Sequence, residues 1–219
     1  MVSHAVDYPA NLVVRGMRCL IVGGGRVAKV KAQGLIGAGA LVVMVAEHLC
    51  DEAENLAGVE FHRRPYRAGE ISQLARRGRP TRAGAYRLVV AATSDETVND
   101  RVCMDAEAVG VWACRVDAGG PGDFYGSAVL RRGRLTVAVS TGAAAPGLSV
   151  AVRDRLGAFL GEEYATLAEL LSTERADLLD RGGMVRDADW KTALGSDMLE
   201  LIKAGHLDQA RERLHQCLS

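Results

Sequence analysis

Residues 17–28, MRCLIVGGGRVA, decide the fold of this chain. A short apolar run, 17–22, leads into three glycines, and residues 26–37 then follow a helical pattern. Between the two lies a hexapeptide that fits the motif G-x-G-x-x-[GA], namely Gly23-Gly24-Gly25-Arg26-Val27-Ala28. The motif is weak alone, but between a strand and a helix it is typical of a dinucleotide-binding turn. A plain glycine turn in a sheet protein is the alternative.

Each small residue of the motif has its own expected task. Gly23 permits the tight turn, Gly25 lets the backbone approach a pyrophosphate, and Ala28 lets the helix pack close to the strand. The start of the helix adds free N–H groups and a partial positive charge. We therefore expect residues 23–28 to hold the phosphates of a dinucleotide.

An acidic residue after the second apolar run bears on the choice of dinucleotide. Glu47, followed by His48, lies 22 residues after Gly25 and just beyond residues 41–46. A carboxylate there suits the adenosine ribose and would repel a 2′-phosphate, which favours NAD over NADP. An exposed acid at a helix start is the competing interpretation. Thr93 follows the fourth apolar run, at the end of a predicted strand. Open sheets bind ligands at this end of their strands.

The first half of the chain alternates apolar runs with helical segments. The runs predict five strands, at 17–22, 41–46, 59–62, 86–92 and 112–116. Strands alternating with helices imply a parallel sheet, and continuous runs such as LVVMVA suit strands covered on both faces. We expect an α/β fold with a Rossmann-type parallel sheet as an NAD-binding domain over residues 1–117. The Arg-rich segment 75–85 is interpreted as a surface loop.

The pattern changes after about residue 117. Residues 128–131 and 135–140 predict a hairpin joined by Arg132 and Gly133, within a dimerisation region spanning 118–150. Residues 151–219 are expected to form a helical C-terminal domain, broken at Arg181-Gly182-Gly183.

Composition excludes several classes of protein. Lys+Arg and Asp+Glu number 27 each, so no general nucleic-acid binder is indicated. No apolar run is long enough to span a membrane, and the N-terminus does not resemble a signal peptide. Five scattered cysteines favour neither disulfides nor a zinc site, and His62, His206 and His215 show no ligand spacing. We expect a cytoplasmic protein with no bound metal.

Three motifs in order resemble one known family. The chain is similar to precorrin-2 dehydrogenase, the N-terminal module of siroheme synthase, over about residues 8–160. The matching stretches are the segment from YPANLVVRG to the end of the second strand, VVAATSDETVN against the family's "AATDDxxLN", and VLRRGRLTVAVSTGAAAPGLSVAVRDRL. The resemblance implies oxidation of precorrin-2 to sirohydrochlorin with NAD, and in some members iron insertion to give siroheme.

The family's catalytic carboxylate lies in "NVVDD", which here is Cys114-Arg115-Val116-Asp117-Ala118. The resemblance implies that Asp117, at the end of the fifth strand, is the base that accepts a proton. Asp123 is the alternative base, because the length of the intervening loop allows a second alignment. A loop-capping role for Asp117 is the structural alternative. Because Ala118 replaces the second aspartate, we expect iron insertion to be weak or absent.

The polycarboxylate substrate implies cationic partners. Arg131, Arg132 and Arg134 follow the catalytic segment, although a hairpin with charged turns explains them as well. The next expected contacts, Ser140, Thr141 and Gly142, precede a helix and could bind a carboxylate or cap that helix. Relatives of this kind form homodimers through the region after the sheet, and we expect the same here.

Two other functions stay open at this point. The first is a non-catalytic NAD(H)-binding sensor or interaction module, because a fold does not fix a function. The second is a dehydrogenase acting on a different small substrate. The role of the helices after residue 160 and the final tetrapyrrole product are not indicated by the sequence.

Overall fold

The computed structural model describes residues 7–75, 85–117, 122–182, 190–191 and 193–218. The chain divides into two compact units, Met1–Gly126 and Ser127–Ser219. The second unit therefore contains the predicted helical domain and residues 127–150 of the predicted hairpin region, and the boundary lies nine residues later than predicted, after Gly126. Most of the Arg-rich segment predicted as a loop, as well as Ala118 and Gly183, lies outside the described residues.

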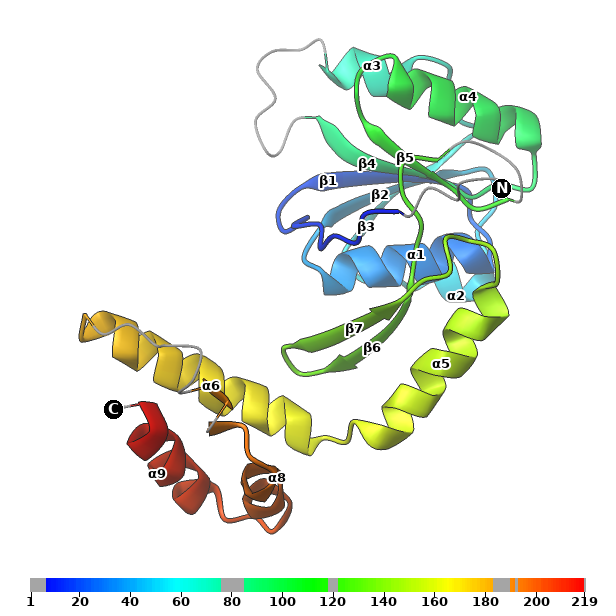
Figure 1. Cartoon of the computed structure of the whole chain (residues 1–219). Coiled ribbons are helices and arrows are strands. Elements are labelled where there is room, and N and C mark those ends of the chain that lie inside the picture. The colour runs from blue at the N-terminus through cyan, green and yellow to red at the C-terminus, as the bar shows by residue number, and fades with distance from the viewer. Residues whose placement is uncertain (1–6, 76–84, 118–121, 183–189, 192, 219) are drawn as a thin grey trace, which may run out of the picture. The chain divides into compact units, whose positions relative to one another are not determined.

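The first unit is built on a five-stranded parallel sheet (Figure 1). Its strands are β1 (Arg18–Val22), β2 (Leu41–Ala46), β3 (Val59–Arg63), β4 (Tyr86–Ala91) and β5 (Trp112–Arg115), in the order β3-β2-β1-β4-β5. Each predicted strand agrees with the structure to within one residue at either end. β1 pairs with β2 on one side and β4 on the other, so the order reverses between β1 and β4. The Rossmann-type sheet is thus confirmed.

Helices cover both faces of this sheet. These helices are α1 (Arg26–Gly37), α2 (Asp51–Glu54), α3 (Glu70–Ala75) and α4 (Glu96–Glu107), and Figure 1 shows α1 on the opposite side from α3 and α4. Ile21 and Met44 pack with Ala28 of α1 on one face, whereas Leu20 and Val89 belong to the core under α4. Burial on both faces explains why β1, β2 and β4 carry continuous apolar runs without alternation.

The second unit holds an antiparallel hairpin and a set of helices. Its elements are β6 (Ala128–Arg132), β7 (Leu135–Val139), α5 (Pro146–Phe159), α6 (Glu163–Asp180), α8 (Ser196–Lys203) and α9 (Leu207–Leu218). Arg132 pairs with Leu135, so the turn is Gly133 and Arg134, one residue later than predicted. The reason is that Gly133 has φ 54°, and a two-residue hairpin turn needs positive φ at its first position.

Only part of the second unit has a core of its own. Leu167, Leu170, Met198, Ile202 and Leu214, with other residues of α6, α8 and α9, are buried together. Residues 127–160 are all described, yet none of their apolar side chains is fully buried. The predicted break after α6 is confirmed at Arg181 and Gly182, where the helix ends. Within the described ranges, no helix combines the length and apolar character needed to cross a bilayer.

Candidate active site

Four predicted site residues follow strands of the first unit at one edge of the sheet. Gly23 comes directly after β1, Glu47 after β2, and Thr93 and Asp117 two residues after β4 and β5. Because all five strands are parallel, their carboxyl ends lie at the same edge. The edge between β1 and β4 is the point at which the strand order reverses, which is where such sheets bind ligands.

The three glycines of the turn are needed for different reasons. Gly23 has φ 125°, and a Cβ added there would overlap the backbone carbonyl of Ala92. A Cβ on Gly24 would overlap the carbonyl oxygen of His48. A Cβ on Gly25 would meet no atom of the described residues within 4 Å. The first two glycines therefore serve the fold, while Gly25 leaves its backbone open to a ligand.

The start of α1 is free to bind an anion. Gly25 is the N-cap and offers no side chain to the first turn, which also holds no acidic residue. The first N–H groups of a helix have no partner within it, and their dipoles favour negative charge. Arg26 and Val27 are exposed beside this end, whereas Ala28 is completely buried against the sheet. This arrangement suits the phosphates of a dinucleotide.

The segment after β2 is fixed to the glycine turn by its backbone. Cys50 donates its N–H to the Gly24 carbonyl at 2.8 Å, and Gly23 donates to Val45 at 2.9 Å. The side chains of Glu47 and His48 are exposed next to these contacts. The structure thus places the predicted ribose-binding carboxylate near the predicted phosphate-binding turn.

Thr93 and Asp117 are connected by a buried amide that the sequence analysis did not single out. Asn99 of α4 is completely buried and accepts from the Thr93 N–H at 3.1 Å. Its Nδ2 donates to the Thr93 carbonyl at 3.1 Å and to Asp117 Oδ2 at 3.1 Å. The fixed N–H donor of Thr93 sets the orientation of the amide. Asn99 belongs to the AATSDETVN motif, which was the available signal.

Asp117 is also held by Arg115, the second residue that the sequence analysis missed. Arg115 Nη2 donates to Asp117 Oδ2 at 2.8 Å and its Nε donates to Oδ1, while Nη1 contacts Asp100. These hydrogen bonds, with that from Asn99, lower the pKa of Asp117 to about 2, against desolvation. The spacing i, i+2 places both residues on one side of an extended chain, and was the signal available.

Asp123, the alternative base, has a backbone role. Its Oδ2 accepts from the Ala113 N–H at 2.7 Å, and its own N–H donates to the Ala113 carbonyl at 2.8 Å. These bonds attach the backbone at Asp123 to β5.

The predicted substrate-binding residues all belong to the second unit. Arg132 donates to the carbonyls of Leu160 and Gly157 at the end of α5, and Arg134 pairs with Glu169 of α6 at 2.8 Å. Arg131 is exposed and has no ion pair with any described residue. Of the three arginines, Arg131 is the one whose guanidinium makes no hydrogen bond or ion pair with a described residue.

The segment before α5 is organised by its own hydroxyl groups. Ser140 Oγ accepts from the Gly142 N–H at 3.1 Å, and Thr141 Oγ1 accepts from Ala145 at 3.0 Å. Thr141 also contacts the buried Ser149 at 3.2 Å. Thr141 thus helps to hold the segment before α5. The N-cap of α5 is Ala145, which makes no side-chain cap, so the helix capping expected from sequence is not observed.

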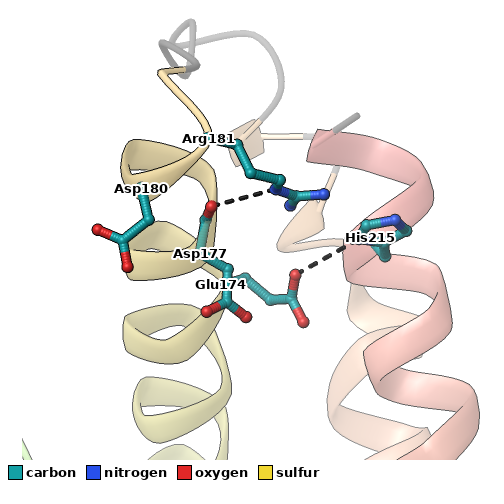
Figure 2. A pocket seen from close by; sticks show the side chains of 5 residues that line it. All are labelled: Glu174, Asp177, Asp180, Arg181 and His215. Carbon is teal, nitrogen blue, oxygen red and sulfur yellow. Dashed lines mark hydrogen bonds and ion pairs between the residues drawn. The ribbon is translucent and has the colours of Figure 1, made fainter.

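A hollow of the second unit lies apart from every predicted site residue along the chain. It is lined by Glu174, Asp177, Asp180, Arg181 and His215, from α6 and α9 and the residue after α6 (Figure 2). Figure 2 shows His215 facing Glu174, with a separation of 3.7 Å, and Arg181 donating to the Asp177 carbonyl. Among the described residues, no group of His, Cys, Asp and Glu is arranged to hold a metal ion.

Comparison with known proteins identifies relatives of the first unit and of the whole chain. Residues 10–128, more than half of the chain, match the model of a family described as "Putative NAD(P)-binding". The siroheme synthase of Chromobacterium violaceum is 34% identical over 211 residues, which cover 95% of this chain and 43% of that protein. The siroheme synthase of Gluconacetobacter diazotrophicus is 35% identical, over 99% of this chain and 46% of that protein.

The chain therefore spans less than half the length of these curated relatives. A solved structure named "SirC, precorrin-2 dehydrogenase" matches with a TM-score of 0.67 and 24% identity, covering 96% of this chain and 98% of that one. At this level of identity the match establishes the fold, including the hairpin and the C-terminal helices.

Proposed function

The chain belongs to the NAD(P)-binding family, and from this premise we propose that it is a dehydrogenase that oxidises precorrin-2 to sirohydrochlorin with NAD. The observation that carries the proposal is the uncapped start of α1 beside Gly25, at the switch point of the sheet. The names of the curated relatives support a place in siroheme biosynthesis.

The cofactor site is assigned to the carboxyl edge of the sheet. Residues 23–28 bind the pyrophosphate through the N–H groups at the start of α1, and Glu47, beside His48, accepts hydrogen bonds from the ribose. Thr93 lines the edge between β1 and β4. NAD, when bound, supplies the hydride acceptor. Glu47→Gln should reduce the ratio of NAD affinity to NADP affinity. If a titration shows unchanged affinities for both cofactors, Glu47 does not contact the ribose.

Asp117 is assigned as the base that accepts the proton lost by the substrate when its hydride is transferred to NAD. At neutral pH the carboxylate is ionised and carries no proton of its own, because its pKa is about 2. Asn99 and Arg115 fix the position of both oxygens. The carboxylates of the tetrapyrrole are assigned to Arg131 and Arg132 and to the Ser140-Thr141-Gly142 segment.

The test is an anaerobic incubation of precorrin-2 with NAD, following NADH by absorbance. We expect turnover by the wild type and a loss of about 10²- to 10⁴-fold in Asp117→Ala, the range of general-base catalysis, with NAD affinity nearly intact. Absence of NADH in the wild type would overturn the proposal. If Asp117→Ala keeps its rate while Asp123→Ala loses it, Asp123 is the base.

A second candidate function is a non-catalytic NAD(H) sensor. The observation that favours it is the tight hold on Asp117, because a carboxylate with a pKa of about 2 has little affinity for a proton. In that case the wild type would bind NAD but form no NADH from precorrin-2, and Asp117→Ala would bind NAD with unchanged affinity. Rapid siroheme formation from sirohydrochlorin and ferrous iron would contradict our expectation that iron insertion is weak or absent.

We also propose that the protein works as a cytoplasmic homodimer. Residues 127–160 bury no apolar side chain fully within the chain, although β6, β7 and α5 carry many. A second copy related by two-fold symmetry is the commonest partner for such a region. All five cysteines are free, as is usual in a reducing compartment.

A further inference from the structure

Arg115 lies between two carboxylates at the carboxyl end of β5. Two of its nitrogens contact both oxygens of Asp117, and the third contacts Asp100 of α4. The Arg115 side chain is only 8% exposed, compared with 22% for Asp117 and 60% for Asp100. A bidentate pair of a guanidinium with a carboxylate fixes direction as well as charge.

A second donor holds the same carboxylate from the opposite element. Asn99 Nδ2 donates to Asp117 Oδ2, and this amide cannot turn over without breaking its bonds to Thr93. Asp117 is thus restrained from β5 by Arg115 and from α4 by Asn99. Both of its oxygens receive hydrogen bonds before any substrate is present.

The other ionisable groups around this pair come from α4 and from the segment after β5. Asp100 and Cys103 lie on α4, and Asp123 follows the loop. Asp100 shares the Arg115 guanidinium with Asp117. The Arg115 contacts are the largest influence on the pKa of Asp117, which they lower.

We propose that Arg115 is a positioning residue for the carboxylate of Asp117. It holds the carboxylate in one orientation as an anion and in return makes it a weaker base than an unpaired aspartate. This inference rests on the proposed function, in which Asp117 accepts the proton. Arg115→Gln removes the charge, while Asn99 still holds the carboxylate, so Asp117 should stay in place and regain part of the proton affinity of an unpaired aspartate.

The first experiment measures Asp117 directly, without substrate. Carbon-13 NMR of the carboxyl groups between about pH 3 and 6, with Asp117→Asn to identify the signal, should show no titration of Asp117 in the wild type. In Arg115→Gln the signal should titrate at a pH at least about one unit higher than in the wild type, since a neighbouring arginine lowers an aspartate pKa by about 1–3 units. Arg115→Lys should fall between them.

The matched control is Arg63→Gln, which removes one exposed arginine of the first unit that pairs with Glu54. It should leave the Asp117 signal unchanged. If Asp117 in the wild type titrates near the ordinary value of about 3.9, the proposal is overturned, whatever the variants do. Circular dichroism of the same samples checks that each variant is folded.

The second experiment is the pH profile of NADH formation from precorrin-2. Arg115→Gln should gain a fall in rate on the acid side at a pH where the wild type is still flat, and Arg115→Lys should restore the flat profile in part. A merely structural role would lower the rate equally at every pH, which would contradict the proposal. If the wild type forms no NADH, the proposed function fails, while the NMR titration still decides the role of Arg115.

Discussion

Two neighbouring glycines in the turn after β1 differ in what surrounds them. A Cβ on Gly24 would overlap the carbonyl of His48, whereas Gly25, with φ −82°, faces open space among the described residues. The backbone of Gly25 thus tolerates a side chain in the free protein, and only a bound pyrophosphate would not. The motif G-x-G-x-x-[GA] leaves the position of Gly24 unspecified, so only the structure shows that this residue too must be a glycine.

The first prediction compares Gly25→Ala with Gly24→Ala. Gly25→Ala should unfold at the wild-type temperature but bind NAD about 5- to 150-fold more weakly, as expected if crowding costs about 1–3 kcal/mol. Gly24→Ala should lower the free energy of unfolding by about 1–3 kcal/mol. Thermal unfolding and NAD titration measure both. Equal NAD affinity in Gly25→Ala and the wild type would rule out close approach of the cofactor at this residue.

The second prediction concerns stability in acid. The pKa of Asp117 is about 2 in the folded protein, below the ordinary value of about 3.9 expected after unfolding. The unfolded state therefore binds the proton first as the pH falls. The stability that Asp117 contributes is fully present above about pH 4 and is lost between about pH 4 and 2.

Asp117→Asn should lack this part of the pH dependence, although it can still accept from Asn99. Urea unfolding at constant ionic strength, at several pH values between 2 and 6, should show the wild type losing its advantage over the variant on acidification. Parallel curves for the two proteins would show that Asp117 is not stabilised as an anion.

At the scale of elements, α4 positions several of the side chains in the candidate site. It supplies Asn99 and Asp100, and its N-cap, Asp95, accepts from the N–H groups of Thr97 at 2.9 Å and Val98 at 3.3 Å. Thr93 Oγ1 in turn accepts from the Asp95 N–H at 3.2 Å. The cap therefore fixes the start of α4 relative to the end of β4.

The third prediction is the cost of removing this cap. Asp95→Ala should lower the free energy of unfolding by about 0.5–2 kcal/mol, because two N–H groups lose their acceptor. Glu96→Ala is the matched control, since Glu96 is an exposed acid of the same helical turn that does not cap it. Denaturant unfolding measures both, and equal losses would mean that charge near the helix start, not the cap, is what stabilises α4.

Local patterns predicted the elements well, but not the contacts between them. Apolar runs such as 41–46 identify buried parallel strands because both faces are covered, and Gly23–Ala28 identifies the turn by its position between strand and helix. The i, i+2 spacing was a local signal for the pairing of Arg115 with Asp117. The contacts of this pair with Asp100 and Asn99 depend on how α4 packs beside β5, which no local pattern specifies. Arg132 likewise turned out to bind carbonyls at the end of α5.

At the scale of the whole molecule, the two units differ in how completely they bury their apolar residues. The sheet of the first unit has a core on each face, and α6, α8 and α9 of the second share another. Residues 127–160 contribute to none of these three cores. On α5, Leu148 and Phe159 are 56% and 73% exposed and, eleven residues apart, lie on the same face of the helix.

The last prediction follows from this uncovered face. We expect a dimer at micromolar concentration, and Phe159→Glu should shift it towards monomer, because a two-fold interface would bury the new charge twice. Leu179→Glu is the matched control: Leu179 is 56% exposed on α6, whose buried side packs in the C-terminal core, so its dimer should persist. Light scattering and sedimentation over a range of concentrations measure the mass. A monomeric wild type would show that the protein does not dimerise as predicted. A dimeric Phe159→Glu would show that the contact lies on another face of the molecule. Loss of the dimer in both variants would mean that added charge, rather than its position on α5, disrupts assembly.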